Sequence, residues 1–267
     1  EYTNHAAGAY IAQINGYYKK AGLNLSIYES YSTGTALAAA LVRGDIQVAY
    51  ICLVPAINAF SNAKVPIRVV AGTHKYGYGI VVNQQKIQSI ADLTKPGIRL
   101  GCVQAGSAAN IQRMNPSRQI MAARMGRLDA VFVPEHWATL SESAGFRMLL
   151  TAKDIWPGMQ GSVLVVKEDL IKHQPEIVRK LVQVLRLATD WAHDHPSESA
   201  ELMAEQLLQP RDNVLSSGKT TSTRQVNASS DIMQRSMQRL EYATTLDPVM
   251  VQDTIDYLAS HGYIKAS

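Results

Sequence analysis

Several features that would quickly assign this 267-residue chain to a class are scarce or missing. Its two cysteines, Cys52 and Cys102, are too few for a disulfide framework, and no CxxC or Cys/His spacing typical of zinc sites occurs. No apolar run approaches the roughly 18 residues that a membrane-spanning helix needs, so we expect a soluble chain. The start, EYTNHAAG, lacks the basic residues and apolar stretch of a cleavable signal segment. A processed chain would begin in the same way, so this start does not identify a compartment.

The motifs of well-known enzyme classes are also missing. There is no GxSxG, HExxH, Walker A or GxGxxG sequence, so nothing specifies a reaction. The net charge is +4, but the basic residues are scattered and form no recognisable nucleic-acid motif, so we expect no nucleic-acid partner. Apolar residues make up 46% and charged residues 18%, which is an ordinary globular balance and excludes a disordered chain.

What is present is a regular alternation of strand-like and helix-like segments over the first 150 residues. Branched and aromatic runs separated by alanine-rich helical stretches favour helical crossovers between strands, and therefore a mainly parallel sheet. The expected strands are 24–30, 46–51, 67–72, 98–103, 128–133 and 146–150, and the expected helices are 35–44, 55–63 and 117–126.

Two stretches of this region resemble each other. AALVRGDIQVAY and IMAARMGRLDAVF each contain an alanine-containing helix, a glycine stop and an apolar strand, and each strand then runs into a proline, in ICLVPA and VPEHWA. The similarity predicts two α/β lobes that are built alike, each with its own sheet. A chance similarity between two strand–helix units is the alternative.

The last third of the chain is expected to be helical. The segment 175–195 places apolar residues on one stripe and has a proline in its first turn. Further amphipathic helices are expected at 197–208, 231–243 and 247–262. The polar, Gly/Ser/Thr-rich segment 209–230 is expected to be a long loop.

The stretch VFVPEHWATL places Glu135, His136 and Trp137 directly after an apolar strand. These residues could form a catalytic or metal cluster, the wall of a binding pocket, or an ordinary strand-to-helix turn. Ligands of open parallel sheets bind beyond the carboxyl ends of the strands, where helix N-termini offer free N–H groups to anions. Polar or small loops occur at several such positions, namely 32–35, 51–55, 72–77, 104–110 and 134–137. Their common placement favours a small-molecule pocket. His5, His74 and His136 have no metal-ligand spacing, so neither a metal nor a cofactor is expected.

The sequence resembles the substrate-binding proteins of nitrate/sulfonate/taurine-type ABC transporters, including the binders of thiamine-pyrimidine precursors. The resemblance covers most of residues 1–205, in the order of the family. The matching segments are NHAAGAYIAQINGYYKKAGLNLSI, ALVRGDIQVAYI, VPIRVVAG, SIADLTKPGIRLGCVQAGS, GRLDAVFVPEHWA and VVKEDLIKHQPEIVRKLVQ.

The resemblance implies an α/β, two-lobed periplasmic-binding-protein fold with two crossovers (type II) and a helical C-terminal segment. Lobe one would comprise 1–80 plus 163–267, and lobe two 81–162. The function implied is the solute-binding component of an ABC importer, which captures a small organic anion, an amino-sulfonate or a heteroaromatic ligand by hinge closure. Its partner would be a membrane permease, and the protein would be a periplasmic or otherwise extracytoplasmic monomer, not an enzyme.

The positions that match ligand-facing residues of the family come from both lobes. Glu135 would accept a hydrogen bond from an amine, and Trp137 would stack on a flat group. The set is Asn4, His5, Thr33, Gly34, Cys52, Thr73, His74, Gly106, Ser107, Glu135, His136 and Trp137.

The chain departs from the family pattern in two places. The family's first strand should precede EYTNHAAG, and only eight residues separate Ser107 from Pro116, where the family fits a helix and another strand. Lobe two is therefore expected to be shortened, or a segment is absent from the sequence. If Cys52 and Cys102 end strands of different lobes, a disulfide would block hinge motion, so two reduced thiols are predicted.

Two alternative functions stay open. One is an enzyme on the same fold, similar to pyrimidine synthases or dehydratases, that uses cleft residues such as His5, His74 or Glu135 as acid or base. The other is a sensor or effector-binding module, against which the absence of a DNA-binding segment argues.

Overall fold

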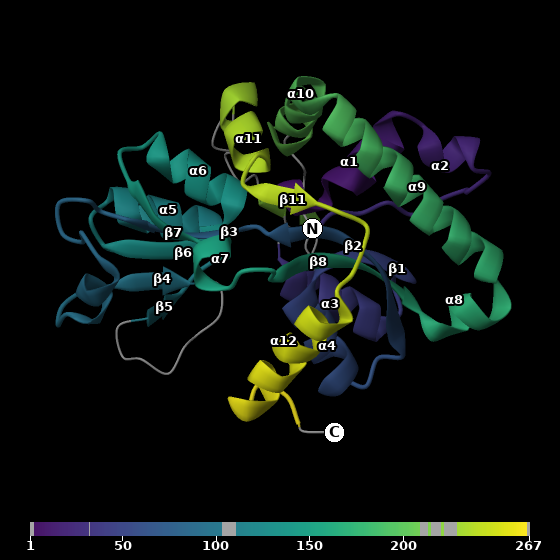
Figure 1. The fold of residues 1–267 in the computed structure, drawn as a ribbon, viewed down its shortest axis with the longest axis horizontal. Helices are drawn as coiled ribbons and strands as arrows, with labels where there is room; N and C mark the ends of the chain where they lie inside the picture. Colours follow the sequence, from purple (N-terminus) through teal and green to yellow (C-terminus); the bar gives the residue numbers. More distant parts are fainter. Residues whose placement is uncertain are drawn as a thin grey trace.

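The protein folds around two β-sheets that lie side by side with helices around them (Figure 1). The computed structural model describes residues 3–31, 33–102, 111–208, 213–214, 220–221 and 229–265. Within these residues the first sheet contains, in spatial order, β1 (Val48–Cys52), β8 (Gln160–Lys167), β2 (Ile67–Tyr76) and β11 (Leu240–Tyr242). The second contains β5 (Ile111–Arg113), β4 (Leu100–Cys102), β6 (Ala130–Pro134), β3 (Tyr78–Val82) and β7 (Arg147–Thr151). The predicted α/β class is confirmed.

The chain passes between the sheets twice. It leaves the first sheet at the end of β2, turns at Gly77 and continues at once as β3 of the second sheet. It returns from β7 through the short helix α7 (Ala152–Ile155) to β8. Gly77 has a φ of +98°, a left-handed conformation that glycine adopts without steric cost.

The strand directions differ from the sequence-based expectation. β8 is antiparallel to β1 and β2, and β3 is antiparallel to β6 and β7. In the described part of the chain, the parallel ladders are β4 with β5 and β4 with β6. The prediction of a mainly parallel sheet is therefore wrong. The strand–helix rhythm does not reveal that β3 and β8 arrive from the other sheet and enter in the opposite direction.

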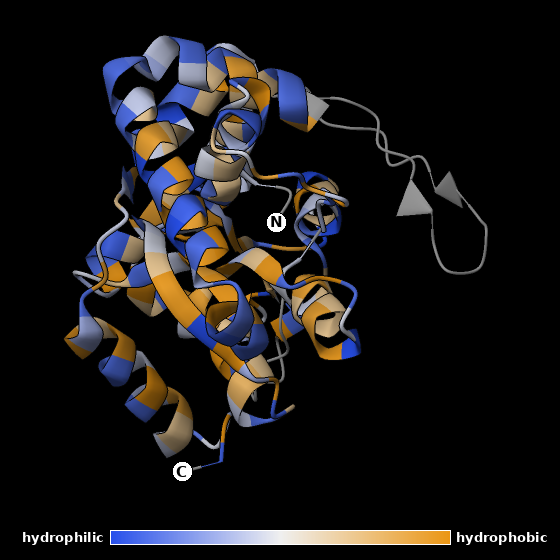
Figure 2. Ribbon diagram, turned by 90° about the vertical axis from the view of Figure 1, so that its right-hand side faces the viewer, coloured by the Kyte–Doolittle hydropathy of each residue, from blue (hydrophilic) through white to orange (hydrophobic). Residues whose placement is uncertain are grey.

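One face of the first sheet is covered by helices from both ends of the chain. The amphipathic helix α9 (Pro175–Asp194) buries Leu181, Val184, Leu185 and Ala188, which confirms the predicted stripe. These side chains join one apolar core with Leu164 and Val166 of β8. In Figure 2 the long helix alternates between hydrophilic and hydrophobic residues, as a half-buried helix should. The other elements of this layer are η1 (Asn4–Ala6), α1 (Ala7–Ile14), α2 (Tyr17–Lys20), α8 (Glu168–His173), α10 (Pro196–Leu208) and α11 (Ser230–Met237).

The opposite face of the first sheet packs against α3 (Gly34–Arg43), α4 (Leu53–Ser61) and α12 (Pro248–Ser260). Helix α3 ends at Gly44, whose φ of +86° confirms the predicted glycine stop. The alternate residues Val163 and Val165 of β8 enter this second core. The central strand β8 is therefore buried on both faces.

The second sheet has smaller cores. Helices α5 (Pro116–Arg124) and α6 (Glu135–Glu142) pack on one face around Val131 and Val133. On the other face, Ile87 and Leu93 of the segment that contains η2 (Ile90–Thr94) pack near Val82. None of the described helices is both long and apolar enough to cross a membrane.

Two further expectations need correction. Residues 24–30 form no strand, and Leu25 and Ile27 are 41% and 57% exposed, because among the described residues this segment has no strand partner. The helix expected over 231–243 ends at Met237, and Leu240–Tyr242 pairs with β2 instead. Of the expected loop 209–230, the structure describes a two-residue ladder between β9 (Asn213–Val214) and β10 (Thr220–Thr221), and Ser229 and Ser230 at the start of α11.

Candidate functional site

Polar side chains from both sheets meet where β2 passes into β3. They come from η1, from the end of β1, from the end of β2 and from the first residues of β3 and β8. We call His5, Cys52, His74, Tyr78 and Ser162 the junction cluster. Four of them belong to the first sheet and its helices, and Tyr78 begins the second sheet.

His5 is held in place by the backbone around it. The Thr3 hydroxyl caps η1 by accepting the His5 N–H at 3.1 Å. Nε2 of His5 lies 2.7 Å from the carbonyl oxygen of Gly77, and because a carbonyl only accepts, Nε2 donates. The His5 and His74 rings lie 4.5 Å apart. The imidazole of His5 therefore spans from the first sheet to the connection between the sheets.

Cys52 is the meeting point of the cluster. Its Sγ lies 3.6 Å from Nδ1 of His5 and 3.1 Å from the hydroxyl of Tyr78. The hydroxyl of Ser162 donates to the same sulfur at 3.4 Å. Cys102 ends β4 in the second sheet, so the two thiols belong to different sheets.

Two glycines make room for the histidines. A Cβ on Gly77 would lie 2.8 Å from Nε2 of His5 and 2.7 Å from Cε1 of His74. A Cβ on Gly161 would lie 2.5 Å from both Nδ1 of His74 and the carbonyl oxygen of Tyr76. Both strands that cross between the sheets therefore need a residue without a side chain beside His74.

Asn4 and Thr73 border the cluster on the side of the first sheet. The side-chain amide of Asn4 donates to Ser236 at 2.8 Å, and the backbone carbonyl oxygen of Asn4 accepts from the Tyr242 hydroxyl at 2.9 Å. Oδ1 of Asn4 and Oγ1 of Thr73 are buried and have no hydrogen-bond partner among the described residues. Buried polar atoms normally have a partner, so these two fit a ligand or a water molecule.

His136 enters from the second sheet at the start of α6. Burial, and to a smaller extent the nearby His5, lower its pKa from 6.5 to about 3. The ring is thus neutral at physiological pH. Its Nδ1 is buried without a partner in the described part of the chain, so it can take part in one further hydrogen bond.

Glu135 is engaged within the protein. Its side chain is 1% exposed and accepts from Thr139 at 2.6 Å and from Arg239 at 3.2 Å. Burial raises the pKa of this carboxyl, while Thr139 and Arg239 oppose the rise. Its backbone N–H donates to the carbonyl oxygen of Gly77 at 2.9 Å. The expectation that Glu135 accepts from a ligand amine thus meets a carboxylate that already has two donors.

Other expected residues make different contacts. Thr33 caps α3 by accepting the N–H of Ala36 at 3.2 Å, with Gly34 as the first helical residue. Trp137 packs into the core of the second sheet, with its ring 5.1 Å from that of His136. Gly106 and Ser107 lie outside the described residues.

Three residues around the cluster were missed in the sequence. Tyr78 lies in YGYG, directly at the passage between sheets, and its aromatic–glycine alternation is a signal that could have been used. Tyr242 and Arg239 lie more than 100 residues away from Glu135, in a segment expected to be helical. No local pattern connects them to the site.

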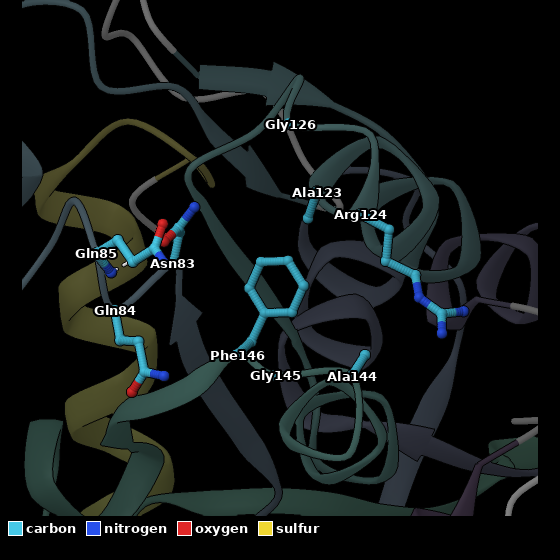
Figure 3. A pocket seen from close by; sticks show the side chains of 9 residues that line it. All are labelled: Asn83, Gln84, Gln85, Ala123, Arg124, Gly126, Ala144, Gly145 and Phe146. Atoms are coloured by element: carbon cyan, nitrogen blue, oxygen red, sulfur yellow. Dashed lines mark hydrogen bonds between the residues drawn. The ribbon is translucent and has the colours of Figure 1, made fainter.

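A pocket of about 390 Å³ lies elsewhere, at the outer end of the second sheet (Figure 3). Its wall includes Asn83, Arg124 and Phe146, and Phe146 lies at its centre in the view. Because β3 runs from Tyr78 at the junction to Val82, Asn83 marks the opposite end of that strand. The pocket is therefore separate from the junction cluster.

The described residues contain no group of three or more His, Cys, Asp or Glu side chains placed to hold a metal ion. Nε2 of His5 lies near a backbone carbonyl and the Cys52 sulfur near a hydroxyl, as given above, and Nδ1 of His74 lies 3.1 Å from the backbone carbonyl oxygen of Lys75. The chemistry visible at the junction is hydrogen bonding.

Solved structures show the same fold. The alkanesulfonate-binding protein SsuA from Xanthomonas axonopodis pv. citri, bound to MOPS, matches with a TM-score of 0.78 at 16% identity, covering 98% of this chain and 92% of that chain. The aliphatic sulphonate-binding protein SsuA from Escherichia coli gives 0.77 at 14% identity, with 98% and 91% covered. The nitrate-binding protein NrtA from Synechocystis PCC 6803 gives 0.73 at 14% identity, with 100% and 81% covered.

These matches confirm the expected two-lobed periplasmic-binding-protein fold. A search of curated protein sequences gives no match. A protein-family model described as NMT1/THI5 like matches residues 3–199, which is well over half of the chain. The resemblance inferred from the sequence is thereby confirmed, and the chain belongs to the NMT1/THI5-like family.

Proposed function

We propose that this protein is the solute-binding component of an ABC importer. It captures a small organic anion, an amino-sulfonate or a heteroaromatic ligand between two lobes that close around it. Family membership and a fold shared with sulfonate- and nitrate-binding proteins support this proposal. The protein acts as an extracytoplasmic, periplasmic monomer that delivers its ligand to a membrane permease.

The observation that carries the proposal is the set of buried polar atoms without partners beside the junction cluster. Asn4 and Thr73 supply such atoms from the first sheet, and His136 supplies one from the second. A ligand that bonds to both sides would be held only when the sheets are close. Such a ligand favours the closed state because it has two sets of contacts there.

The mechanism requires two lobes that move about the crossing strands. We assign about 1–80 plus 163–267 to lobe one and about 81–162 to lobe two, while the strands themselves change sheet at Gly77 and between β7 and β8. The passage at Gly77 and the return between Thr151 and Gln160 are short, as hinges between such lobes should be. Thr33 and Gly34 at the start of α3 would offer backbone N–H groups to an anionic ligand, and Trp137 would border a flat one.

Thermal-shift screening tests the proposal. The panel comprises MOPS, taurine, nitrate, bicarbonate, succinate, benzoate and 4-aminopyrimidine. A compound present at a hundred times its dissociation constant should stabilise the protein by about 2.7 kcal/mol. If no compound raises the melting temperature while a divalent metal does, the proposal is wrong.

The contact between Cys52 and His5 favours a second candidate, an enzyme on the same fold. In the neutral ring, Nε2 of His5 donates to Gly77, which leaves Nδ1 as an acceptor 3.6 Å from the Cys52 sulfur. A base in hydrogen-bond reach of a thiol is the arrangement that activates cysteine nucleophiles. Stoichiometric binding without consumption of the compound would exclude this candidate.

A further inference from the structure

A group of charged residues joins the two sheets beside the junction cluster. Arg239 donates to Thr139 at 2.9 Å and to Glu135 at 3.2 Å, and its other terminal nitrogen lies 2.9 Å from Glu142. Arg235 also contacts Glu142, at 2.9 Å. We call these five residues the α6–α11 clamp. It contains two cations and two carboxylates, so its charges balance.

The two sides of the clamp are anchored to different sheets. Glu135, Thr139 and Glu142 are spaced by four and three residues along α6, so they lie on one face of that helix. Helix α6 follows β6 of the second sheet directly. Arg239 precedes β11, whose Leu240 pairs with Tyr76 of the first sheet. Figure 1 shows α11 next to α6, which lies over the second sheet, and residues of the two helices are in contact.

The clamp lies next to the passage between the sheets. Tyr76, the partner of Leu240, is the residue before Gly77, and the N–H of Glu135 donates to the Gly77 carbonyl. A rotation about Gly77 that separates the sheets would draw Arg239 away from α6. It would leave the Glu135 carboxylate, which is 1% exposed here, without its cation.

We propose that Arg239 is a positioning residue that clamps α6 onto the first lobe and so favours the closed arrangement even without ligand. This inference rests on the proposed closure of two lobes. The clamp also holds the start of α6, and therefore His136, at the junction. The ligand-facing atoms of both lobes would thus be preorganised before the ligand arrives.

The test measures the distance between the lobes in the ligand-free protein. Dyes are attached to cysteines introduced at Gln84, in the turn after β3 of the second sheet, and at Arg186 of α9. Both positions are exposed, whereas Cys52 and Cys102 are buried. Single-molecule energy transfer then gives the populations of closed and open molecules. Arg239→Met should raise the open population about tenfold, which is a typical size for conformational coupling.

Two further variants separate clamping from folding. Arg239→Met with Glu135→Gln removes both charges of this pair, so no unpaired carboxylate stays buried. The double variant should regain the stability that Arg239→Met alone loses and yet stay open. Lys75→Met breaks an ion pair of 2.6 Å with Glu241, which lies between β2 and β11 inside the first sheet, and should leave the open population unchanged.

The result that overturns the inference is a double variant with the wild-type distance distribution, because the clamp would then contribute only to folding. A Lys75→Met variant that opens as much as Arg239→Met would overturn it as well. Since no ligand is added, a failure of the thermal-shift screen leaves this test intact. A failed clamp likewise leaves the proposed binding function standing.

Discussion

The strands β1 and β6 show how one structural unit serves two purposes. Each lies beside a strand that has crossed from the other sheet, and each leads directly into a helix. After β1 the helix begins with the apolar Leu53, which is buried in the core of the first sheet. After β6 it begins with Glu135 and His136, which are buried but polar.

The cores around the two units differ in the same sense. The central strand β8 of the first sheet is buried along almost its whole length, between helices from both ends of the chain. The strand β7 of the second sheet is only half-buried throughout. The first sheet thus forms the larger scaffold, and the second presents a polar helix start to it. This comparison leads to four predictions on stability.

Removal of a large core side chain should show the difference in stability between the two sheets most clearly. Leu164 of β8 and Leu128 before β6 are both fully buried, but Leu164 lies in the larger core. We expect Leu164→Ala to cost about 4 kcal/mol and Leu128→Ala about 3 kcal/mol of unfolding free energy. Denaturant titration followed by tryptophan fluorescence measures the unfolding free energy of each variant. Equal losses at both sites would remove the distinction between the cores.

Gly161 tests how closely His74 packs against the crossing strand. Gly161→Ala places a Cβ 2.5 Å from the His74 ring and from the Tyr76 carbonyl, so we expect a loss of about 3 kcal/mol. The control is Gly126→Ala, between α5 and β6. Gly126 has a φ of +67°, and an added Cβ there would meet no atom within 4 Å. That change should cost only about 1 kcal/mol. Similar losses at both glycines would show that the strand has room to move.

His136 should make the protein sensitive to acid. The pKa of His136 is 6.5 in the unfolded chain and about 3 in the folded protein. Below pH 6.5 the unfolded chain therefore takes up a proton that the folded protein does not, and the free energy of unfolding decreases as the pH is lowered. By pH 4.5 the loss at this site should reach about 2.7 kcal/mol. His136→Gln should lack this loss in denaturant titrations between pH 7 and 4.5. His261→Gln, at the exposed end of α12, should keep the wild-type slope.

Asp129 gives the second sheet a different dependence on acid. Burial alone would raise its pKa, but hydrogen bonds from Arg99 and Lys86 outweigh it and lower the pKa from 3.8 to about 2. The stabilisation, about 2 kcal/mol, is present above pH 3.8 and is lost as the pH falls toward 2. Asp129→Asn should therefore destabilise the protein at pH 7. Between pH 4 and 2 its unfolding free energy should change less with pH than that of the wild type. A variant as stable as the wild type at pH 7 would contradict the assignment.

Much of this fold follows from local sequence signals. The glycine stop at Gly44 and the proline starts of α5, α9 and α12 mark real helix boundaries. The prediction of a strand at 24–30 was wrong because alternation shows which side chains suit a sheet, but not whether a partner strand exists. The prediction of the strand directions was wrong because β3 and β8 enter their sheets from the other sheet, and this path depends on the whole chain.

The candidate site divides in the same way. Sequence placed His5, Cys52, His74 and His136 at strand and helix ends, and the structure brings them to one junction. The sequence could not predict the partner of Glu135, because Arg239 lies 104 positions further along the chain. Contacts between the two ends of a chain leave no spacing pattern, so they need a structure.

The central claim is that one small molecule binds between the two sheets. Calorimetric titration with whichever panel compound gives the largest thermal shift tests it most directly, with mass spectrometry of the recovered compound. We predict one site per chain, an unchanged compound and affinity weakened at least tenfold by His136→Leu, since one ring hydrogen bond to the ligand is lost. Conversion of the compound, or binding that His136→Leu and Asn4→Ala leave unaltered, would contradict the account.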